Sequence, residues 1–264
     1  MRPAHVLISI WLVSLVATAA HARSALVLPP PDRLGPIPAG TYDDDGNRLG
    51  EAALSYRRGD DGLIYMQAVT TMEDGPKNVL NAVFEEIHDG RAVRVLREDS
   101  LSHDADGNPM VLVEVDHEKG EARCIPPDGE SEDIEVIELP EEDRVGNTIM
   151  QLLFQPLVRG ETKRIEFQAF LCRGGARLVN FVAVPAPRVP GAADDGVVEV
   201  RFGPDLGRVM SWLASAVVPK LRFWFDAEHG GYVAHRMPLF GGGPEVVVRR
   251  ENVAAGRTPR ALPR

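Results

Sequence analysis

The stretch Arg144–Val158, RVGNTIMQLLFQPLV, is flanked by segments with a different hydrophobic pattern. Before and after it, apolar and polar residues alternate in short runs that are broken by Gly and Asp. An apolar band as wide as the one in this stretch predicts a helix that is buried on more than one side. Asp143 can cap the first turn and Pro156 should end the helix, so we expect it over residues 144–157. The band consists of two adjacent stripes at helical spacing, Ile149, Leu152, Leu153 and Leu157 beside Met150, Phe154 and Val158.

The segments around this helix have the pattern of antiparallel strands. Turn sequences such as Arg58–Gly62 and Asp104–Asn108 recur at short intervals, and the runs between them alternate with period two. The pattern predicts about eleven or twelve strands joined by hairpins, with a second possible helix over residues 205–218. Examples of inward-facing positions are Ala52, Leu54 and Tyr56 in one run, and Ile165, Phe167, Ala169 and Leu171 in another.

The strand count predicts the overall architecture. A sheet this long curls because strand twist accumulates, and its concave apolar face must be covered. The segment 144–157 is apolar enough to cover that face from inside. The predicted fold is therefore mainly β, a long curved antiparallel meander that forms a half-barrel wrapped around a central helix. This single domain should occupy residues 41–251.

The two ends of the chain predict export and little packing. Arg2, the apolar run Val6–Val16 and the small residues of Ala20–Ala22 form a signal peptide pattern, with residues 1–22 removed after Ala22. An uncleaved membrane anchor is the weaker alternative, because the apolar run is short. We expect a periplasmic protein with no transmembrane segment after cleavage. Residues 23–40 are rich in proline and predict an extended leader, and residues 252–264 predict a disordered tail.

Charge and cysteine content restrict the possible partners. The net charge of −10 repels phosphate backbones, which argues against nucleic acid as a partner. Cys124 and Cys172 are the only cysteines, too few for a four-cysteine zinc site or a CxxC motif. In an oxidising compartment they either pair as a structural disulfide or remain two separate buried thiols.

Several polar clusters are candidates for metal binding or acid–base chemistry. Asp43–Asn47 and Asp104–Asn108 both have the sequence D-x-D-G-N, which opens many calcium loops and also suits a hairpin turn. Both lack the later glycine and glutamate of a calcium loop, which favours the turn. His117 begins like a zinc-protease motif, but the second histidine is missing. We expect no cofactor and no metal.

The layout of the chain resembles a known family type. The residues Asp143–Leu153, DRVGNTIMQLL, and Phe223–Asp226, FWFD, within an exported chain of hairpins, resemble the periplasmic DUF3108-type proteins. More distantly, the chain is similar to the lipoprotein carriers LolA and LolB. The resemblance covers roughly residues 40–251. The likeness to LolA and LolB implies a curved sheet around a helix and the binding of a lipid or acyl chain. The DUF3108 type implies no established activity. The lipid-anchor cysteine of LolB-like proteins is missing here.

Two functional hypotheses follow. The first is a non-catalytic carrier of an apolar ligand, a lipid or acyl chain, in maintenance of the cell envelope. Its expected lining residues are Ile149, Leu153, Phe154, Phe167, Leu171, Trp212 and Trp224. The second is an assembly factor of the envelope that has a filled core and binds a partner protein through a sheet edge. An enzyme is a weaker third option, because it would rest on a cluster of His229, His235 and Asp226 or Glu228 across one hairpin.

Overall fold

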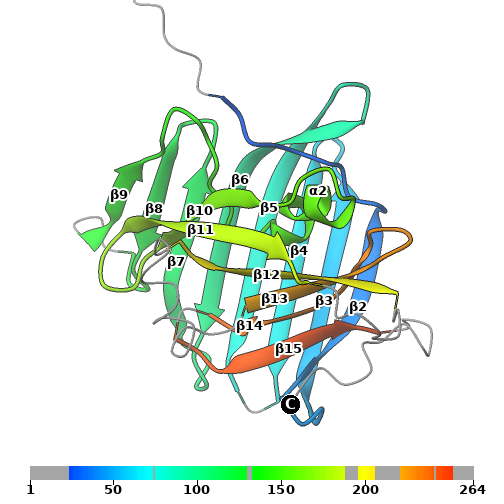
Figure 1. The fold of residues 1–264 in the computed structure, drawn as a ribbon. Helices are drawn as coiled ribbons and strands as arrows, with labels where there is room; N and C mark the ends of the chain where they lie inside the picture. Colours follow the sequence, from blue (N-terminus) through cyan, green and yellow to red (C-terminus); the bar gives the residue numbers. More distant parts are fainter. Residues whose placement is uncertain are drawn as a thin grey trace, which may run out of the picture.

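The computed structural model describes residues 24–73, 75–129, 133–187, 196–205, 221–240 and 242–251. The predicted signal peptide, nearly all of the second predicted helix with Trp212, and the predicted tail lie outside these residues. The described part forms one antiparallel sheet of 15 strands and two helices of one turn each (Figure 1). The elements in chain order are β1 (Val27–Leu28), β2 (Gly35–Tyr42), β3 (Arg48–Arg58), β4 (Ile64–Met72), β5 (Lys77–Ile87), β6 (Ala92–His103), β7 (Pro109–Asp116), β8 (Glu121–Ile125), β9 (Glu135–Glu138), α1 (Met150–Leu153), α2 (Gln155–Val158), β10 (Ile165–Leu171), β11 (Arg177–Pro185), β12 (Val197–Pro204), β13 (Leu221–Asp226), β14 (Tyr232–Pro238) and β15 (Glu245–Arg250).

The sheet consists of two meanders joined side by side. The strands β2 to β9 follow one another in sequence order, and so do β10 to β15. The meanders meet where β15 pairs with β2, from Val247 opposite Tyr42 to Arg250 opposite Ala39. This leaves β9 and β10 as the two ends of the strand order, although they follow each other in the chain. The segment between them, which contains α1 and α2, therefore crosses from one end of the sheet to the other.

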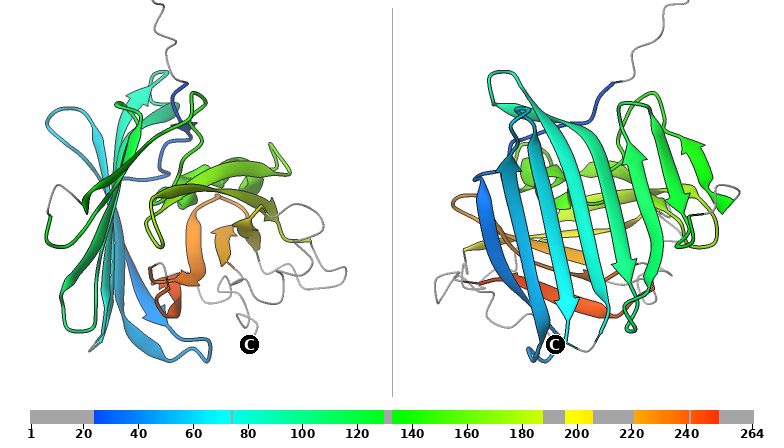
Figure 2. Two further views of the ribbon diagram at one scale, coloured as in Figure 1. Left: turned by 90° about the vertical axis from the view of Figure 1, so that its left-hand side faces the viewer. Right: turned by 180° about the vertical axis from the view of Figure 1, so that it is seen from behind.

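The predicted mainly β fold and its antiparallel pairing are confirmed, and the sheet is not closed by backbone hydrogen bonds between β9 and β10. Alternation explains the burial, because successive side chains of a strand point to opposite faces. In β3, Ala52, Leu54 and Tyr56 are buried as expected, and Phe167 and Ala169 are buried in β10. Figure 2 shows β2–β7 as one curved wall, with β10–β15 crossing in front of its inner side.

The central helix is buried as predicted, and its side chains fill the space inside the sheet. Phe154 is fully buried, and its ring contacts those of Phe167, Phe202 and Phe223 at centroid distances of 5.8, 5.3 and 5.5 Å. Met150, Leu152, Leu153 and Leu157 belong to the same buried cluster, together with inward residues of β2–β6 and β10–β13. Among the described residues, none of the helices has the length and apolar character needed to cross a membrane.

The start of the central helix was predicted incorrectly, whereas its predicted end at residue 157 lies one residue from the end of α2 at Val158. Residues 144–149 are not helical, because Val145 bridges Gln168 of β10 as a short parallel strand would. Asp143 does not cap the helix, because the first helical turn begins after Ile149 and has no side-chain cap. Pro156 lies in the first turn of α2, and the helix ends near it, two residues later at Val158. The position is tolerated because the first amides of a helix have no intrahelical acceptor, so the N–H that proline lacks is not missed.

The proline-rich leader is extended as predicted, but two parts of it pair in the sheet, which the prediction of an unpacked segment missed. Leu26 and Leu28 are buried beside β6, and Ile37 and Ala39 are buried in β2. Pro36 and Pro38 point to the exposed face. Pro36 pairs with β3 alone, since β15 reaches β2 only from Ala39 onward, and Pro38 meets the chain after β15 only through its carbonyl oxygen, which accepts from the amide of Glu251. Proline lacks a backbone donor but keeps its carbonyl acceptor, so it is accepted where the strand donates no hydrogen bond to a second neighbour.

Covalent and side-chain contacts join the two ends of the sheet, a region that we call the seam. A disulfide links Cys124 of β8 to Cys172, which follows β10, with a Cα–Cα distance of 5.6 Å. This is the pairing that the sequence left open. The Asn147 side chain donates to the Phe170 carbonyl oxygen and accepts from the Phe170 amide, both at 2.8 Å. Apolar side chains from β7, β8, β10 and the loop before α1 pack around these contacts, including Val115, Ala122, Phe170 and Val145.

Candidate functional site

A pocket of about 360 Å³ opens beside the central helix. Its walls come from the segment before β2, from β2 and β3, from α1 and α2, from the β13–β14 turn and from the end of β15. Side chains that are buried in the core form its apolar part, namely Ile37, Leu54, Leu152 and Val233. The exposed side chains of Asp32, Arg33 and His229 form its polar rim. The pocket is thus apolar at depth and charged at its mouth.

Two tyrosines line the pocket, Tyr56, which is buried, and Tyr232, which is partly buried. The Tyr56 hydroxyl accepts a hydrogen bond from Nε2 of Gln151 at 3.0 Å. The Tyr232 hydroxyl lies 2.7 Å from Nδ1 of His235 and 3.2 Å from the carbonyl oxygen of Val248. A carbonyl oxygen only accepts, so Tyr232 donates to Val248 and Nδ1–H of His235 donates to Tyr232. Burial raises the pKa of both tyrosines, and both hydroxyls therefore stay protonated at neutral pH.

Gln155 lies in the pocket wall and is almost completely buried, at 3% exposed. Its Nε2 donates to the carbonyl oxygens of Gln151 at 3.1 Å and Gly230 at 2.9 Å. Both partners are pure acceptors, so the orientation of the amide is fixed. Its Oε1 then faces Gly230, and this oxygen has no hydrogen-bond donor among the described residues. A buried acceptor without a donor costs free energy, and a ligand that donates to it would remove this cost.

The histidines of the β13–β14 hairpin do not form the shared cluster that the enzyme hypothesis required. His229 is exposed, and its Nδ1 lies 3.3 Å from Oδ1 of Asp226. His235 instead stacks on Phe223 at 5.0 Å and hydrogen-bonds Tyr232. Burial lowers the pKa of His235 to about 4, so it is neutral near pH 7. His229 and Asp226 line the pocket, whereas His235 supports Tyr232 from behind.

The residues that the sequence predicted to line a ligand site do not line the pocket. Ile149, Leu153, Phe154 and Phe167 are packed in the central cluster, and Leu171 is partly buried at the end of β10. Trp224 packs in a separate small cluster with Val233 and Ala234, and its Nε1 lies 3.3 Å from Glu199. The alternation identified these side chains as inward-facing, but it could not show which inward positions face each other and which face a gap. Trp212 lies outside the described residues.

The two D-x-D-G-N segments are hairpin turns with the same geometry. In each, Oδ1 of the first aspartate accepts from two backbone amides of the turn, and Oδ2 accepts from the asparagine side chain. The carboxylates of Asp43 and Asp104 are therefore turned onto their own loops. Gly46 and Gly107 adopt φ values of 86° and 83°, which favour glycine. Within the described residues, no group of three or more His, Cys, Asp and Glu side chains is arranged to hold a metal ion.

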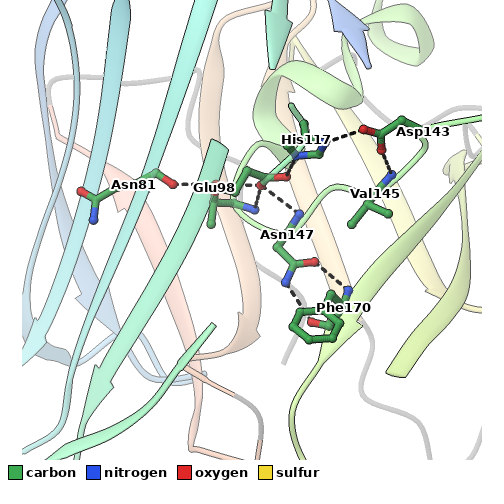
Figure 3. Close-up of polar contacts among 8 residues, drawn as sticks. Asn81, Glu98, His117, Asp143, Val145, Asn147 and Phe170 are labelled. Carbon is green, nitrogen blue, oxygen red and sulfur yellow. Dashed lines mark hydrogen bonds and ion pairs between the residues drawn. The ribbon is translucent and has the colours of Figure 1, made fainter. Parts of the chain in front are cut away.

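A buried charged network, which the sequence did not predict, lies at the seam (Figure 3). Nε2 of His117 lies 3.1 Å from Oε1 of Glu98, and its Nδ1 lies 2.7 Å from Oδ2 of Asp143. All three side chains are almost completely buried. Glu98 points inward because Leu96 is an extra residue in β6, opposite the step from Val83 to Phe84. This bulge reverses the alternation, so Glu98 takes a position that the regular pattern assigned to the exposed face.

The network fixes the chain that leads into the central helix. The second carboxylate oxygen of Glu98 accepts from the amide of Asn147 at 3.0 Å and from the amide and hydroxyl of Thr148. Oδ1 of Asp143 accepts from the amide of Val145 at 3.1 Å. The buried ion group therefore supplies acceptors to a loop that has no regular secondary structure. Its carboxylates point to different ring nitrogens of His117, so the three side chains do not converge on one point.

We expect the stability of the protein to fall as the pH rises from about 6.5 to about 9. Desolvation lowers the pKa of His117, but hydrogen bonds and charge interactions with Asp143 and Glu98 outweigh it and raise the pKa to about 9. Since the folded pKa exceeds the unfolded value, this stabilisation is complete below pH 6.5 and is lost as the pH passes 9. Its size is on the order of 3 kcal/mol. Urea unfolding between pH 6 and 10 measures this slope.

Glu98→Gln is the control for this pH dependence. The Gln side chain keeps one oxygen for the amides of Asn147 and Thr148, and its NH₂ group can donate to a neutral His117. The variant should therefore lose most of the slope between pH 6.5 and 9. If the free energy of unfolding falls equally with pH in wild type and variant, groups other than His117 cause the fall.

Comparison with solved structures finds a chain described as a Beta-barrel-like Protein of Domain of Unknown Function DUF1849 from Brucella abortus. It aligns with a TM-score of 0.41 and 10% sequence identity, over 86% of this chain and 97% of that chain. No family model and no curated protein matches this chain. The resemblance to DUF3108-type proteins and to LolA and LolB stays a prediction from the sequence.

Proposed function

We propose that this chain is an exported, non-catalytic binding protein that holds a small amphipathic molecule in the pocket beside α1 and α2. The observation that carries the proposal is the pocket itself, with about 360 Å³ of space, an apolar interior and a charged mouth. Ligand sites in proteins span roughly 300–1,000 Å³ and combine apolar walls with a few polar groups. The volume suits one short chain or a small ring, and a complete two-chain lipid would have to leave part of its body outside.

The proposal refines the expected lipid or acyl-chain ligand. The space around Phe154, where an acyl chain was expected, is occupied by aromatic side chains of the protein itself. The pocket offers apolar contact at Ile37, Leu54 and Leu152 instead. The apolar part of the ligand would lie against these residues, while its polar part stays near the mouth.

Export to the periplasm is part of the proposal. It is supported by the signal peptide pattern of residues 1–22 and by the Cys124–Cys172 disulfide, since disulfides persist mainly in oxidising compartments. The DUF3108-type resemblance agrees with the same location, and the more distant likeness to the carriers LolA and LolB supports a role in cell-envelope maintenance. We propose no reaction, because the roles assigned to the pocket residues are those of binding and orienting a molecule.

Blocking the pocket is expected to abolish ligand retention. The native protein, purified from the periplasm without detergent and extracted with organic solvent, should release a bound small molecule detectable by mass spectrometry. Gly231→Leu should reduce that amount about tenfold or more, because its side chain would occupy the pocket. A Cβ at Gly231 would meet only ordinary contacts, with Asp32 at 3.8 Å and Arg250 at 3.9 Å, so the backbone should tolerate it.

Gly203→Leu is the matched control. Gly203 lies in β12, away from the pocket lining, and a Cβ there has no neighbour within 4 Å. This variant should retain the ligand at the wild-type level. Equal retention by both variants, or no bound molecule in the wild type and no binding of added amphiphiles, would contradict the proposal.

An assembly role remains the second candidate, and one observation favours it. β9 ends the strand order of the described sheet, and Val136 in its centre is 50% exposed. An exposed edge strand can pair with a strand of another protein. The tightly packed centre of the fold also fits the expectation of a filled core. Wild-type protein that carries no small molecule but captures an envelope protein, with Val136→Lys abolishing capture, would support this role over the binding of a ligand.

A further inference from the structure

We propose that the pocket selects a molecule whose polar head is an ammonium group. This inference rests on the proposed function and adds the chemistry of the ligand to it. It is carried by the arrangement of hydrogen-bond acceptors around the consecutive glycines Gly230 and Gly231, at the junction between the β13–β14 turn and β14. A group that donates several hydrogen bonds and carries positive charge matches this arrangement.

The first acceptor is Oε1 of Gln155. Its side chain is 3% exposed, and its amide orientation is fixed by two donated hydrogen bonds to backbone carbonyl oxygens. Its oxygen lies 3.0 Å from the position that a Cβ of Gly230 would take, next to the glycine that lines the pocket. Only a donor can satisfy this atom, so a carboxylate or phosphate head gains nothing from it.

The second acceptor is the carboxylate of Asp32 at the mouth of the pocket. Its Oδ2 lies 3.8 Å from the Cβ position of Gly231, so it stands beside the same pair of glycines as Gln155. Desolvation raises the pKa of Asp32, against the influence of Arg159, and a cation placed beside the carboxylate would reverse that penalty. Asp226 also lies in the pocket wall, but its Oδ1 already accepts from the amides of Glu228 and His229, so Asp32 is the carboxylate that carries the inference. Ammonium–carboxylate hydrogen bonds are about twice as strong as neutral ones.

The positive residues at the mouth do not remove this preference. Arg33 donates to the carbonyl oxygen of Pro36 at 2.9 Å, which holds it to its own loop. Arg250 approaches Gly231 from the end of β15, so it is the group that would attract an anionic head instead. The net charge of −10 favours the approach of cations over anions. Two ligands with the same hydrocarbon chain, one with an ammonium and one with a carboxylate head, therefore test whether Asp32 or Arg250 determines the preference of the pocket.

Three probes with the same six-carbon chain test the inference, namely hexylammonium, 1-hexanol and hexanoate. Isothermal titration calorimetry of the full mature chain at pH 7 should give an affinity for hexylammonium about tenfold or more above the other two. Asp32→Asn should bring hexylammonium down to the level of 1-hexanol and leave 1-hexanol unchanged. Hexylammonium should also shift the side-chain amide resonances of Gln155 in a ¹⁵N–¹H spectrum. Gly231→Leu should abolish all binding, and Gly203→Leu should not.

The outcomes separate this inference from the proposed function. If 1-hexanol or hexanoate binds as tightly as hexylammonium and Gly231→Leu abolishes that binding, the ammonium head is wrong and the pocket still binds ligands. If hexylammonium binds equally to Gly231→Leu, the molecule lies elsewhere and the inference is overturned. If none of the probes binds and the native protein carries no molecule, the inference and the proposed function both fail.

Discussion

Replacing Glu98 with alanine is expected to lower the free energy of unfolding by about 3–5 kcal/mol. The side chain is fully buried and accepts hydrogen bonds from His117, from the amides of Asn147 and Thr148, and from the Thr148 hydroxyl. Alanine would leave these donors without an acceptor inside the protein. Asp143 would then be the one carboxylate left beside His117, so burying the protonated imidazole would cost more free energy.

Urea unfolding at pH 6.5, followed by circular dichroism, measures this loss. Glu51→Ala is the matched control, because Glu51 lies on a strand of the same sheet and its side chain is 85% exposed. The Glu51→Ala variant should lose no more than about 0.5 kcal/mol of unfolding free energy. A Glu98→Ala loss as small as that of the control would show that the loop before α1 is held by its apolar contacts and not by the carboxylate.

Removing the disulfide is expected to cost about 4 kcal/mol, the second large effect. The double variant Cys124→Ala and Cys172→Ala opens a loop that spans 48 residues of sequence separation, which relaxes the unfolded chain. The bond also links β8 to the segment after β10, so its loss removes a covalent tie across the seam. Both cysteines are replaced so that no free thiol remains to react with other molecules.

Thermal and urea unfolding of the double variant measure this effect, and reduction of the wild type provides the control. Wild type in dithiothreitol should unfold at nearly the same urea concentration as the double variant, because both lack the same bond. The double variant itself should not respond to the reductant. A loss below about 1 kcal/mol would mean that the noncovalent contacts of Asn147 and Phe170 hold the seam without the bond.

These two predictions concern the same physical problem, an open sheet whose ends must be held together. A curled sheet that is not closed leaves backbone groups unpaired at both ends. At the β10 end of this protein, the loop after Asp143 supplies part of the pairing, since Gly146 donates to Gln168 and Gln168 donates to Arg144. Glu98 holds that loop, and the disulfide holds β10 to the opposite end.

Some elements could be predicted from the sequence because their signals are local. The alternation of Ala52, Leu54 and Tyr56 identified the buried face of β3, since side-chain direction in a strand depends only on position. The apolar band around Phe154 likewise identified a buried helical turn. The turns that begin at Asp43 and Asp104 were predicted for the same reason, because aspartate and glycine satisfy those loops from within.

Other elements could not be predicted because a distant residue determines them. The start of α1 after Ile149 depends on Glu98, which holds the preceding loop out of helical geometry. The inward position of Glu98 depends in turn on a bulge at Leu96 that regular alternation conceals. Ile37 was assigned to the extended leader because of the prolines around it. It nevertheless lies in β2 and pairs with β3, because Pro36 and Pro38 point to the exposed face of the sheet.

The sequence by itself determined that this chain forms a curved antiparallel sheet around an apolar helical segment, because hydrophobic periodicity is a property of neighbouring residues. The tertiary structure decided where space remains within that sheet. The pocket of about 360 Å³ and the oxygen of Gln155 that faces Gly230 exist because segments far apart in sequence meet without filling the volume between them. Packing is a sum over contacts between distant residues, so periodicity can show which side chains point inward but not which of them leave a gap.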